Sequence, residues 1–123
     1  MTRLIQRDGV TTMHFVPSML SVFLSDITED YDYAPLSSLR QVFTSGEALK
    51  KEHAHTFGKT IHQHIGTRLI NLYGPTEATI DVSYYECQFD DLPSNIPIGK
   101  PIDNTALYIL DKSNHPAAIG VKG

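Results

Sequence analysis

The stretch "TRLINLYGPTEATID", residues 67–81, holds an apolar run that stops abruptly at a Gly-Pro pair. Branched and aromatic side chains dominate its first half, which predicts a short strand over residues 67–73. Gly74 and Pro75 end this strand, because proline cannot donate a hydrogen bond to a β-ladder. Glu77 then places a carboxylate just beyond the strand end, where backbone groups become free to face a ligand.

Two units of the same kind come earlier in the chain. Residue type and apolar spacing predict strands over residues 10–16 and 39–46 and helices over residues 17–27 and 47–65. The first helix begins at a proline, and the second is expected to be exposed and interrupted near Gly58. A helix tail before them ends at Gly9. The order strand, helix, strand, helix, strand indicates an α/β fold, with a mostly parallel sheet and flanking helices.

The carboxyl ends of parallel strands form the crevice in which such proteins bind ligands. His14, Ser45 and residues 73–77 all lie near predicted strand ends, so three distant stretches are expected to meet at one edge of the sheet. Ordinary turn residues would explain any one of these positions equally well.

The last of these stretches carries groups that suit a nucleotide with its metal. Tyr73 offers a flat face for stacking on a ring, and Thr76 offers a hydroxyl. Glu77 offers a hard oxygen ligand of the kind that Mg²⁺ prefers. An ordinary strand-to-loop turn is the alternative interpretation of the same residues.

The remainder of the chain changes character. Strands are predicted over residues 81–89 and 105–111 without a helix between them, joined by a connection over residues 90–104 that is rich in Pro, Gly and Asn. We therefore expect a single unit, residues 1–123, with an α/β portion over about residues 1–80 and a strand-rich portion over 81–123. Its last residues resemble a turn and the start of another element, so a segment of a larger protein is expected.

Composition narrows the possible classes of protein. The chain has 123 residues, 41% of them hydrophobic and 20% charged, which argues against disorder. A net charge of -4 gives no indication of nucleic-acid binding, and no apolar run reaches the roughly 20 residues of a membrane span. One cysteine, Cys87, excludes an internal disulfide and suits the cytoplasm. The pairs His53/His55 and His62/His64 do not share a helix face and make a poor zinc site.

Four motifs carry a resemblance to a known family: "HFVPSML", "FTSGEAL", "NLYGPTEATID" and "PIGKPIDNTALYILD". In this order and spacing they resemble the amino-acid adenylation domains of nonribosomal peptide synthetases, which make antibiotics and siderophores. The resemblance implies part of the large N-terminal adenylation subdomain. It also implies ATP and Mg²⁺ as cofactors, formation of an aminoacyl-adenylate, and transfer of the acyl group to a phosphopantetheine thiol. The expected partners are peptidyl carrier and condensation domains of the same synthetase.

The resemblance assigns roles to individual positions. Tyr73 would stack on adenine and Asn71 would contact the base, Thr76 would contact the phosphate, and Glu77 would hold Mg²⁺. The remaining positions on the cofactor side are Gly46, Glu47, Ala48 and Gly74. The family's Gly-rich phosphate loop and catalytic lysine have no counterpart among these motifs, so the chain alone is expected to be inactive.

The amino-acid pocket is implied in the same way. Its matching positions are His14, Phe43, Ser45, Leu72, Ile80 and Asp81, a partial set that resembles serine-activating domains. The polar side chains could bond a small hydroxyl group, and they are His14, Ser45 and Asp81. The apolar side chains keep the pocket small, and they are Phe43, Leu72 and Ile80. Two alternatives remain: an acyl- or aryl-acid ligase of the same superfamily, and a binding module without catalytic activity.

Overall fold

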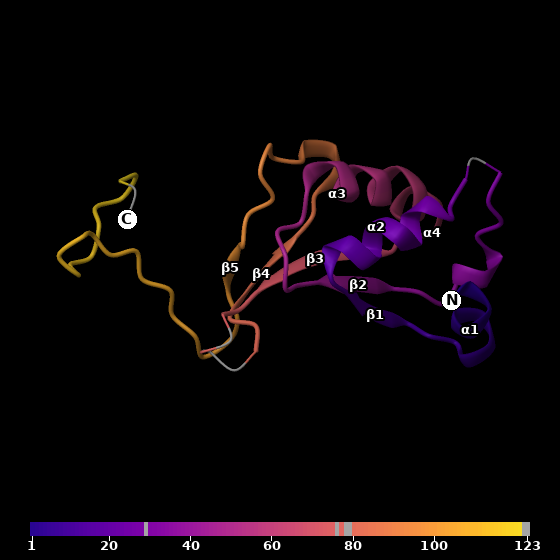
Figure 1. Ribbon diagram of the computed structural model, residues 1–123, viewed down its shortest axis with the longest axis horizontal. Coiled ribbons are helices and arrows are strands. Elements are labelled where there is room, and N and C mark those ends of the chain that lie inside the picture. The colour runs from indigo at the N-terminus through magenta and orange to yellow at the C-terminus, as the bar shows by residue number, and fades with distance from the viewer. Residues whose placement is uncertain (29, 76, 78–79, 122–123) are drawn as a thin grey trace.

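The computed structural model describes residues 1–28, 30–75, 77 and 80–121 (Figure 1). Its first half contains α1 (Thr2–Asp8), β1 (Thr12–Phe15), α2 (Pro17–Ser25), the 3₁₀ turn η1 (Ala34–Leu36), β2 (Gln41–Thr44) and α3 (Lys51–Phe57). The second half contains the π-helical turn η2 (Gly58–His62), α4 (Gln63–Ile65), β3 (Arg68–Tyr73), β4 (Ser83–Glu86), the 3₁₀ turn η4 (Phe89–Asp91) and β5 (Lys100–Pro101). The predicted alternation of strands and helices is confirmed.

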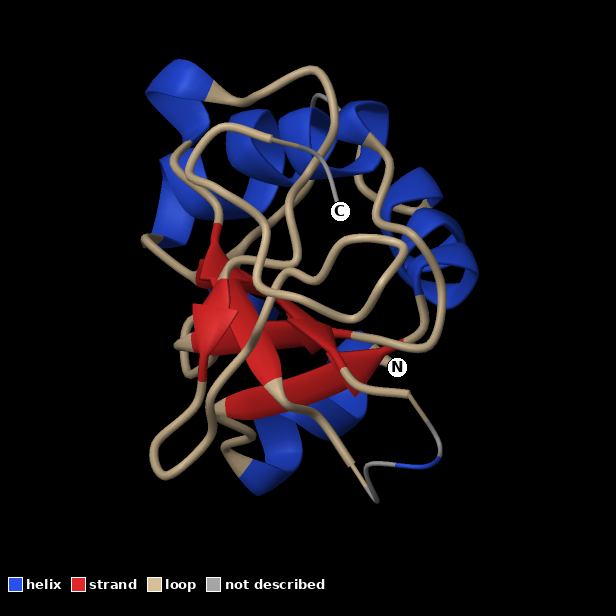
Figure 2. Cartoon of the chain, turned by 90° about the vertical axis from the view of Figure 1, so that its left-hand side faces the viewer, coloured by secondary structure: helices blue, strands red, loops and turns tan. Residues whose placement is uncertain are grey.

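The strands form one mixed sheet in the order β1-β2-β3-β4-β5. β1, β2 and β3 are parallel, with His14 opposite Phe43 and Thr44 opposite Asn71. β4 and β5 are antiparallel additions at one edge. The three parallel strands therefore end on the same side of the sheet, which faces the viewer in Figure 2.

One face of the sheet carries the core. Helices α2 and α3 lie along this face, and Phe15 of β1 stacks on Phe23 of α2 with 5.3 Å between the ring centroids. Val42 and Leu69 are fully buried on the same face. The opposite face, formed by Thr12, His14, Gln41, Phe43, Arg68, Ile70, Leu72, Tyr84 and Glu86, is called the open face below.

The helix after β2 differs in part from the prediction. It begins at Lys51 instead of residue 47, and its interruption at Gly58 takes the form of the π-helical turn. The prediction that this helix is exposed is wrong for one of its sides, because Ala54, Phe57 and Ile61 are fully buried there. Gly58 is needed there, since a Cβ would lie 2.5 Å from the Phe89 ring.

The strand predicted over residues 105–111 is not formed. Leu110 makes one isolated bridge with Pro116, inside a turn that the Asp111 carboxylate holds through the backbone N–H groups of Ser113 and His115. Residues beyond β5 run away from the sheet (Figure 1), and β-branched or aromatic side chains make a strand only where a neighbouring strand is available. β5 lies instead within the connection that was expected to be irregular.

No helix in the described part of the chain has the length and apolar composition that crossing a membrane requires.

Two leucines that differ in burial should differ sharply in their contribution to stability. Leu69→Ala removes a fully buried side chain from β3 and should lower the free energy of unfolding by about 2–5 kcal/mol. Leu107→Ala, at a residue that is 43% exposed, is the matched control and should change it by less than about 0.5 kcal/mol. Urea unfolding followed by circular dichroism measures both. Equal effects would contradict this assignment of the core.

Candidate functional site

A cavity of about 360 Å³ opens where the parallel strands end. It is called the strand-end cavity here, and its walls are Gly46, Glu47, Ala48, Leu49, Asn71, Leu72, Tyr73, Gly74, Ile96 and Ile98. All six residues that were expected on the cofactor side lie on these walls. Leu49, Ile96 and Ile98 were not predicted, because the connection that carries the two isoleucines has no motif.

Asn71 is the most informative residue of the cavity. Its side chain is 5% exposed, and its Nδ2 donates a hydrogen bond to the Pro97 carbonyl at 2.9 Å. This bond sets the amide orientation, since a carbonyl can only accept. Asn71 Oδ1 is buried and has no hydrogen-bond partner among the residues that the structure describes. A buried acceptor without a partner costs about 1–3 kcal/mol, so an N–H group that reached this atom would remove that cost.

The aromatic wall of the cavity is Tyr73, at the end of β3. Its side chain is 43% exposed, which leaves ring surface available to a ligand. Another part of the wall is the loop that begins at Gly46, whose φ of +85° suits glycine. An exposed ring on the wall of a cavity offers a face on which a flat, aromatic molecule can stack.

The Glu47 carboxylate is engaged at the start of α2. It accepts hydrogen bonds from the Ser18 backbone N–H at 3.0 Å and from Ser18 Oγ at 3.1 Å. Glu47 therefore lies on the cavity wall as expected, while its charge is directed to a helix N-terminus. Sequence reasoning missed Ser18, because nothing in the spacing links it to a residue 29 positions away.

Gly74 explains the abrupt break after β3. A Cβ at this position would lie 1.7 Å from the Ile80 carbonyl oxygen, so only glycine allows the returning chain to pass so closely. The Val82 N–H then donates to the Tyr73 carbonyl at 2.7 Å, which starts the antiparallel pairing with β4. Glu77 lies exposed in this loop, and Thr76 lies outside the described residues.

Four of the residues expected in the amino-acid pocket lie together. His14 and Phe43 are paired neighbours on the open face. On β3, the partner of Phe43 is Ile70, and Leu72 is the next residue of that strand on the same face. His14 Nε2 and Ser45 Oγ are hydrogen-bonded at 2.7 Å. This gives an apolar floor with one polar pair at its edge.

The other two pocket residues lie elsewhere. Ile80, 73% exposed, and Asp81 sit in the loop that returns past Gly74. Among the described residues no hydrogen bond joins Asp81 to His14 or Ser45. The structure therefore brings four of the six predicted residues together.

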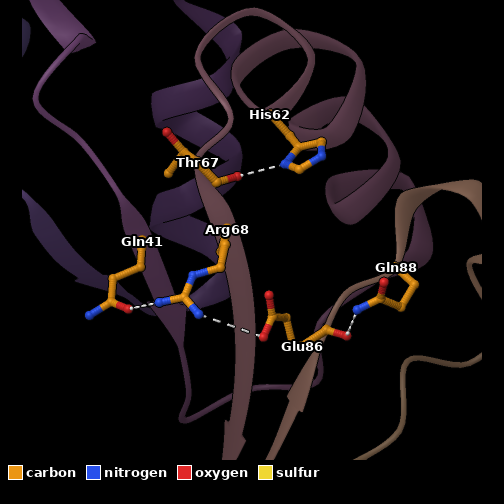
Figure 3. A network of polar contacts seen from close by, with 6 residues as sticks. All are labelled: Gln41, His62, Thr67, Arg68, Glu86 and Gln88. Carbon is orange, nitrogen blue, oxygen red and sulfur yellow. Dashed lines mark hydrogen bonds and ion pairs between the residues drawn. The ribbon is translucent and has the colours of Figure 1, made fainter.

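Polar side chains occupy the amino-terminal end of the open face (Figure 3). Arg68 donates to Gln41 Oε1 at 2.7 Å and lies 3.8 Å from the Glu86 carboxylate. Gln41 in turn donates to Thr12 Oγ1 at 3.3 Å. This polar row bounds the apolar floor, so the part of the open face near His14 is the part suited to a small side chain.

Two histidines of the helical segment, His62 and His64, have packing roles. His62 bonds to the Thr67 carbonyl at 3.0 Å and lies against Phe89, and the His64 ring stacks on Tyr33 with centroids 4.1 Å apart. Within the described residues, no group of three or more His, Cys, Asp or Glu side chains is placed to hold a metal ion.

The whole chain, residues 1–123, matches the family described as AMP-binding enzyme. The chain belongs to this family. It is 43% identical over 123 residues to tyrocidine synthase 3 of Brevibacillus parabrevis, covering 100% of this chain and 2% of that protein. It is also 45% identical over 119 residues to enterobactin synthase component F of Escherichia coli, covering 94% of this chain and 9% of that protein.

Solved structures of this AMP-binding family have the same fold. PA1221, a nonribosomal peptide synthetase protein containing adenylation and PCP domains, superposes with a TM-score of 0.78 at 31% identity, over 95% of this chain and 22% of that one. FmoA3 in its alpha-methyl-L-serine-AMP bound form gives a TM-score of 0.77 at 26% identity, over 94% and 13% of the two chains. The chain thus spans a small part of each of these relatives and has the fold of their adenylation domains.

Cys87 should be unreactive in the folded chain. Burial, with a smaller contribution from the Glu86 charge, raises the pKa of its thiol from 9.0 to about 12. At pH 8 the folded chain should therefore hold about a thousandfold less thiolate than the unfolded chain, and thiolate is the species that reacts. The raised pKa favours the folded state fully below pH 9, and this contribution falls as pH rises toward 12. Reaction with a thiol reagent, with and without denaturant, measures the ratio; equal rates would contradict it.

Proposed function

We propose that the chain is the part of an amino-acid-activating ligase that binds adenine and forms the floor of the amino-acid pocket. The observation that carries this proposal is the strand-end cavity, which is lined by the exposed Tyr73 ring and by Asn71, whose Oδ1 has no hydrogen-bond partner among the described residues. The 6-amino group of adenine would donate to Asn71 Oδ1, and its ring would stack on Tyr73. Membership of the AMP-binding family supports the same ligand.

The reaction that we propose has two steps. A carboxylate oxygen of the amino acid attacks the α-phosphorus of ATP, the bond to the bridging oxygen breaks, and pyrophosphate leaves with that electron pair. A carrier thiol, as its thiolate, then attacks the acyl carbon and releases AMP. Such transfers depend on positioning and charge stabilisation. The role of this chain would be to hold the base between Tyr73 and the Gly46–Ala48 wall and the amino acid near His14.

Glu77 is proposed as a ligand of Mg²⁺ on the phosphates. Mg²⁺ is usually held by one or two carboxylates together with substrate phosphates, so a single exposed carboxylate beyond the cavity fits the ion. The ion, when bound, would neutralise charge that develops on the phosphates. Thr76 is proposed to contact the same phosphate.

Serine is the amino acid that we propose. The His14–Ser45 pair, with 2.7 Å between Nε2 and Oγ, could bond a substrate hydroxyl above Phe43 and Leu72. The similarity to FmoA3, solved with alpha-methyl-L-serine-AMP, supports a small hydroxyl-bearing substrate. Asp81 would join the pocket from the returning loop. A phosphopantetheine-bearing carrier domain is the proposed partner, supported by the PCP domain of PA1221.

Glu77→Gln in the complete enzyme tests the metal role. Loss of the carboxylate should lower kcat by about 10²–10³, or about 2.7–4 kcal/mol, because the group would stabilise charge in the transition state. Thermal stability should not change, since Glu77 is exposed. Serine-dependent pyrophosphate exchange over a range of Mg²⁺ concentrations measures the effect, and Glu52→Gln, at an exposed position of α3, is the control. Unchanged activity with the same Mg²⁺ dependence would remove Glu77 from the metal site.

The substrate proposal is tested by kcat/KM across a panel of amino acids. L-serine should be preferred over alanine, because alanine has no hydroxyl group to bond to the His14–Ser45 pair. It should also be preferred over threonine, whose additional methyl group costs about 1–3 kcal/mol in a small pocket. His14→Ala should reduce the preference over alanine, whereas His115→Ala, at an exposed turn, should leave it unchanged. A large apolar, aromatic or charged amino acid at the head of the panel would refute the serine assignment.

A further inference from the structure

The contact between Glu47 and Ser18 joins two loops that lie far apart in sequence. Helix α2 begins after Val16, whose side chain cannot accept a hydrogen bond from the first turn. The Glu47 carboxylate supplies that acceptor, with one oxygen on the Ser18 N–H and the other on Ser18 Oγ. Hydrogen bonds to an ionised group are shorter and stronger than neutral ones, and a negative charge is stabilised at a helix N-terminus.

A second contact reinforces the same junction. The loop after β2 carries Ser45, which bonds to His14 at 2.7 Å, and Glu47, which bonds to Ser18. Between them lies Gly46, whose Cα faces Val16: an added Cβ would lie 3.4 Å from Val16 Cγ1. The loop is thus tied to the β1–α2 turn on both sides of its glycine. The residues of this loop line the strand-end cavity together with Tyr73.

We propose that Glu47 is a positioning residue, which acts through Ser18 to hold the Gly46–Ala48 wall at the right distance from Tyr73. This inference rests on the proposed function, since it concerns the width of the nucleotide site. It assigns the Glu47 carboxylate to the helix start and not to the nucleotide. The two possibilities differ in one respect: a positioning role needs Ser18, whereas direct contact with the nucleotide does not.

The experiment is a double-mutant cycle in the complete enzyme, measured as kcat and KM for ATP and for the amino acid. Glu47→Ala should raise KM for ATP about tenfold and change kcat by less than about twofold, because the wall contacts the base and not the reacting atoms. Ser18→Ala removes one of the two hydrogen bonds and should raise KM for ATP about threefold. In the Glu47→Ala background Ser18→Ala should have no further effect, because the two residues act as one unit.

Glu47→Gln and Glu52→Ala complete the set. Glu47→Gln keeps an acceptor for Ser18 without the charge and should fall between the wild type and Glu47→Ala. Glu52→Ala removes an exposed carboxylate from the first turn of α3 and should leave both KM values unchanged. Thermal unfolding of each variant separates a loss of fold from a wider cavity, since Ser18→Ala removes only an exposed hydroxyl group.

The outcomes separate the two proposals. The wild-type enzyme should first show serine-dependent exchange. If Ser18→Ala then changes KM for ATP equally in the wild type and in the Glu47→Ala background, the positioning role is overturned and direct contact by Glu47 is favoured. If the enzyme is active and Glu47→Ala leaves KM for ATP unchanged, the positioning role is overturned as well. A complete enzyme that shows no amino-acid-dependent exchange would instead refute the proposed function, and the positioning role with it.

Discussion

The register of the three parallel strands is the constraint on which the rest of the molecule depends. Side chains alternate between the faces of a strand, so a slip by one residue would exchange every buried side chain with an exposed one. Val42 and Leu69 are fully buried against the helices, and this burial excludes a slip by one residue. In that register His14 lies beside Phe43, and Thr44 lies beside Asn71.

This register separates the candidate site into two compartments. Asn71 belongs to the helix-covered face and opens into the strand-end cavity, whereas Leu72, the next residue, also borders the open face. An amino acid on one face and a base on the other would then approach each other where the strands end. Gly74 lies at that boundary, and its contact with the Ile80 carbonyl leaves no room for a side chain.

Much of this arrangement could be predicted from the chain alone, for a physical reason. The strands that end at Thr44 and Tyr73 are short, and the turn residues after them act locally, so pattern and turn chemistry locate them. Contacts between distant side chains could not be predicted, as Ser18 with Glu47 illustrates. The segment over residues 105–111 has β-propensity but no neighbouring strand to pair with among the described residues, and propensity cannot report that. Lys100 and Pro101 form a strand against that expectation, because Gly99, with φ +78°, lets the chain lie against Tyr84.

The connection between β4 and β5 shows why such long-range contacts matter for function. It has the composition of a plain linker, yet Ile96 and Ile98 line the strand-end cavity and the Pro97 carbonyl holds the Asn71 amide. Ser83 Oγ donates to the Ile98 carbonyl at 2.8 Å, which holds the linker beside the sheet. Without the Pro97 bond the amide could rotate and exchange the positions of Nδ2 and Oδ1, which would place a donor where the proposed adenine contact requires an acceptor. If Asn71 contacts the base as proposed, the choice of base would depend on a backbone carbonyl 26 residues away in the chain.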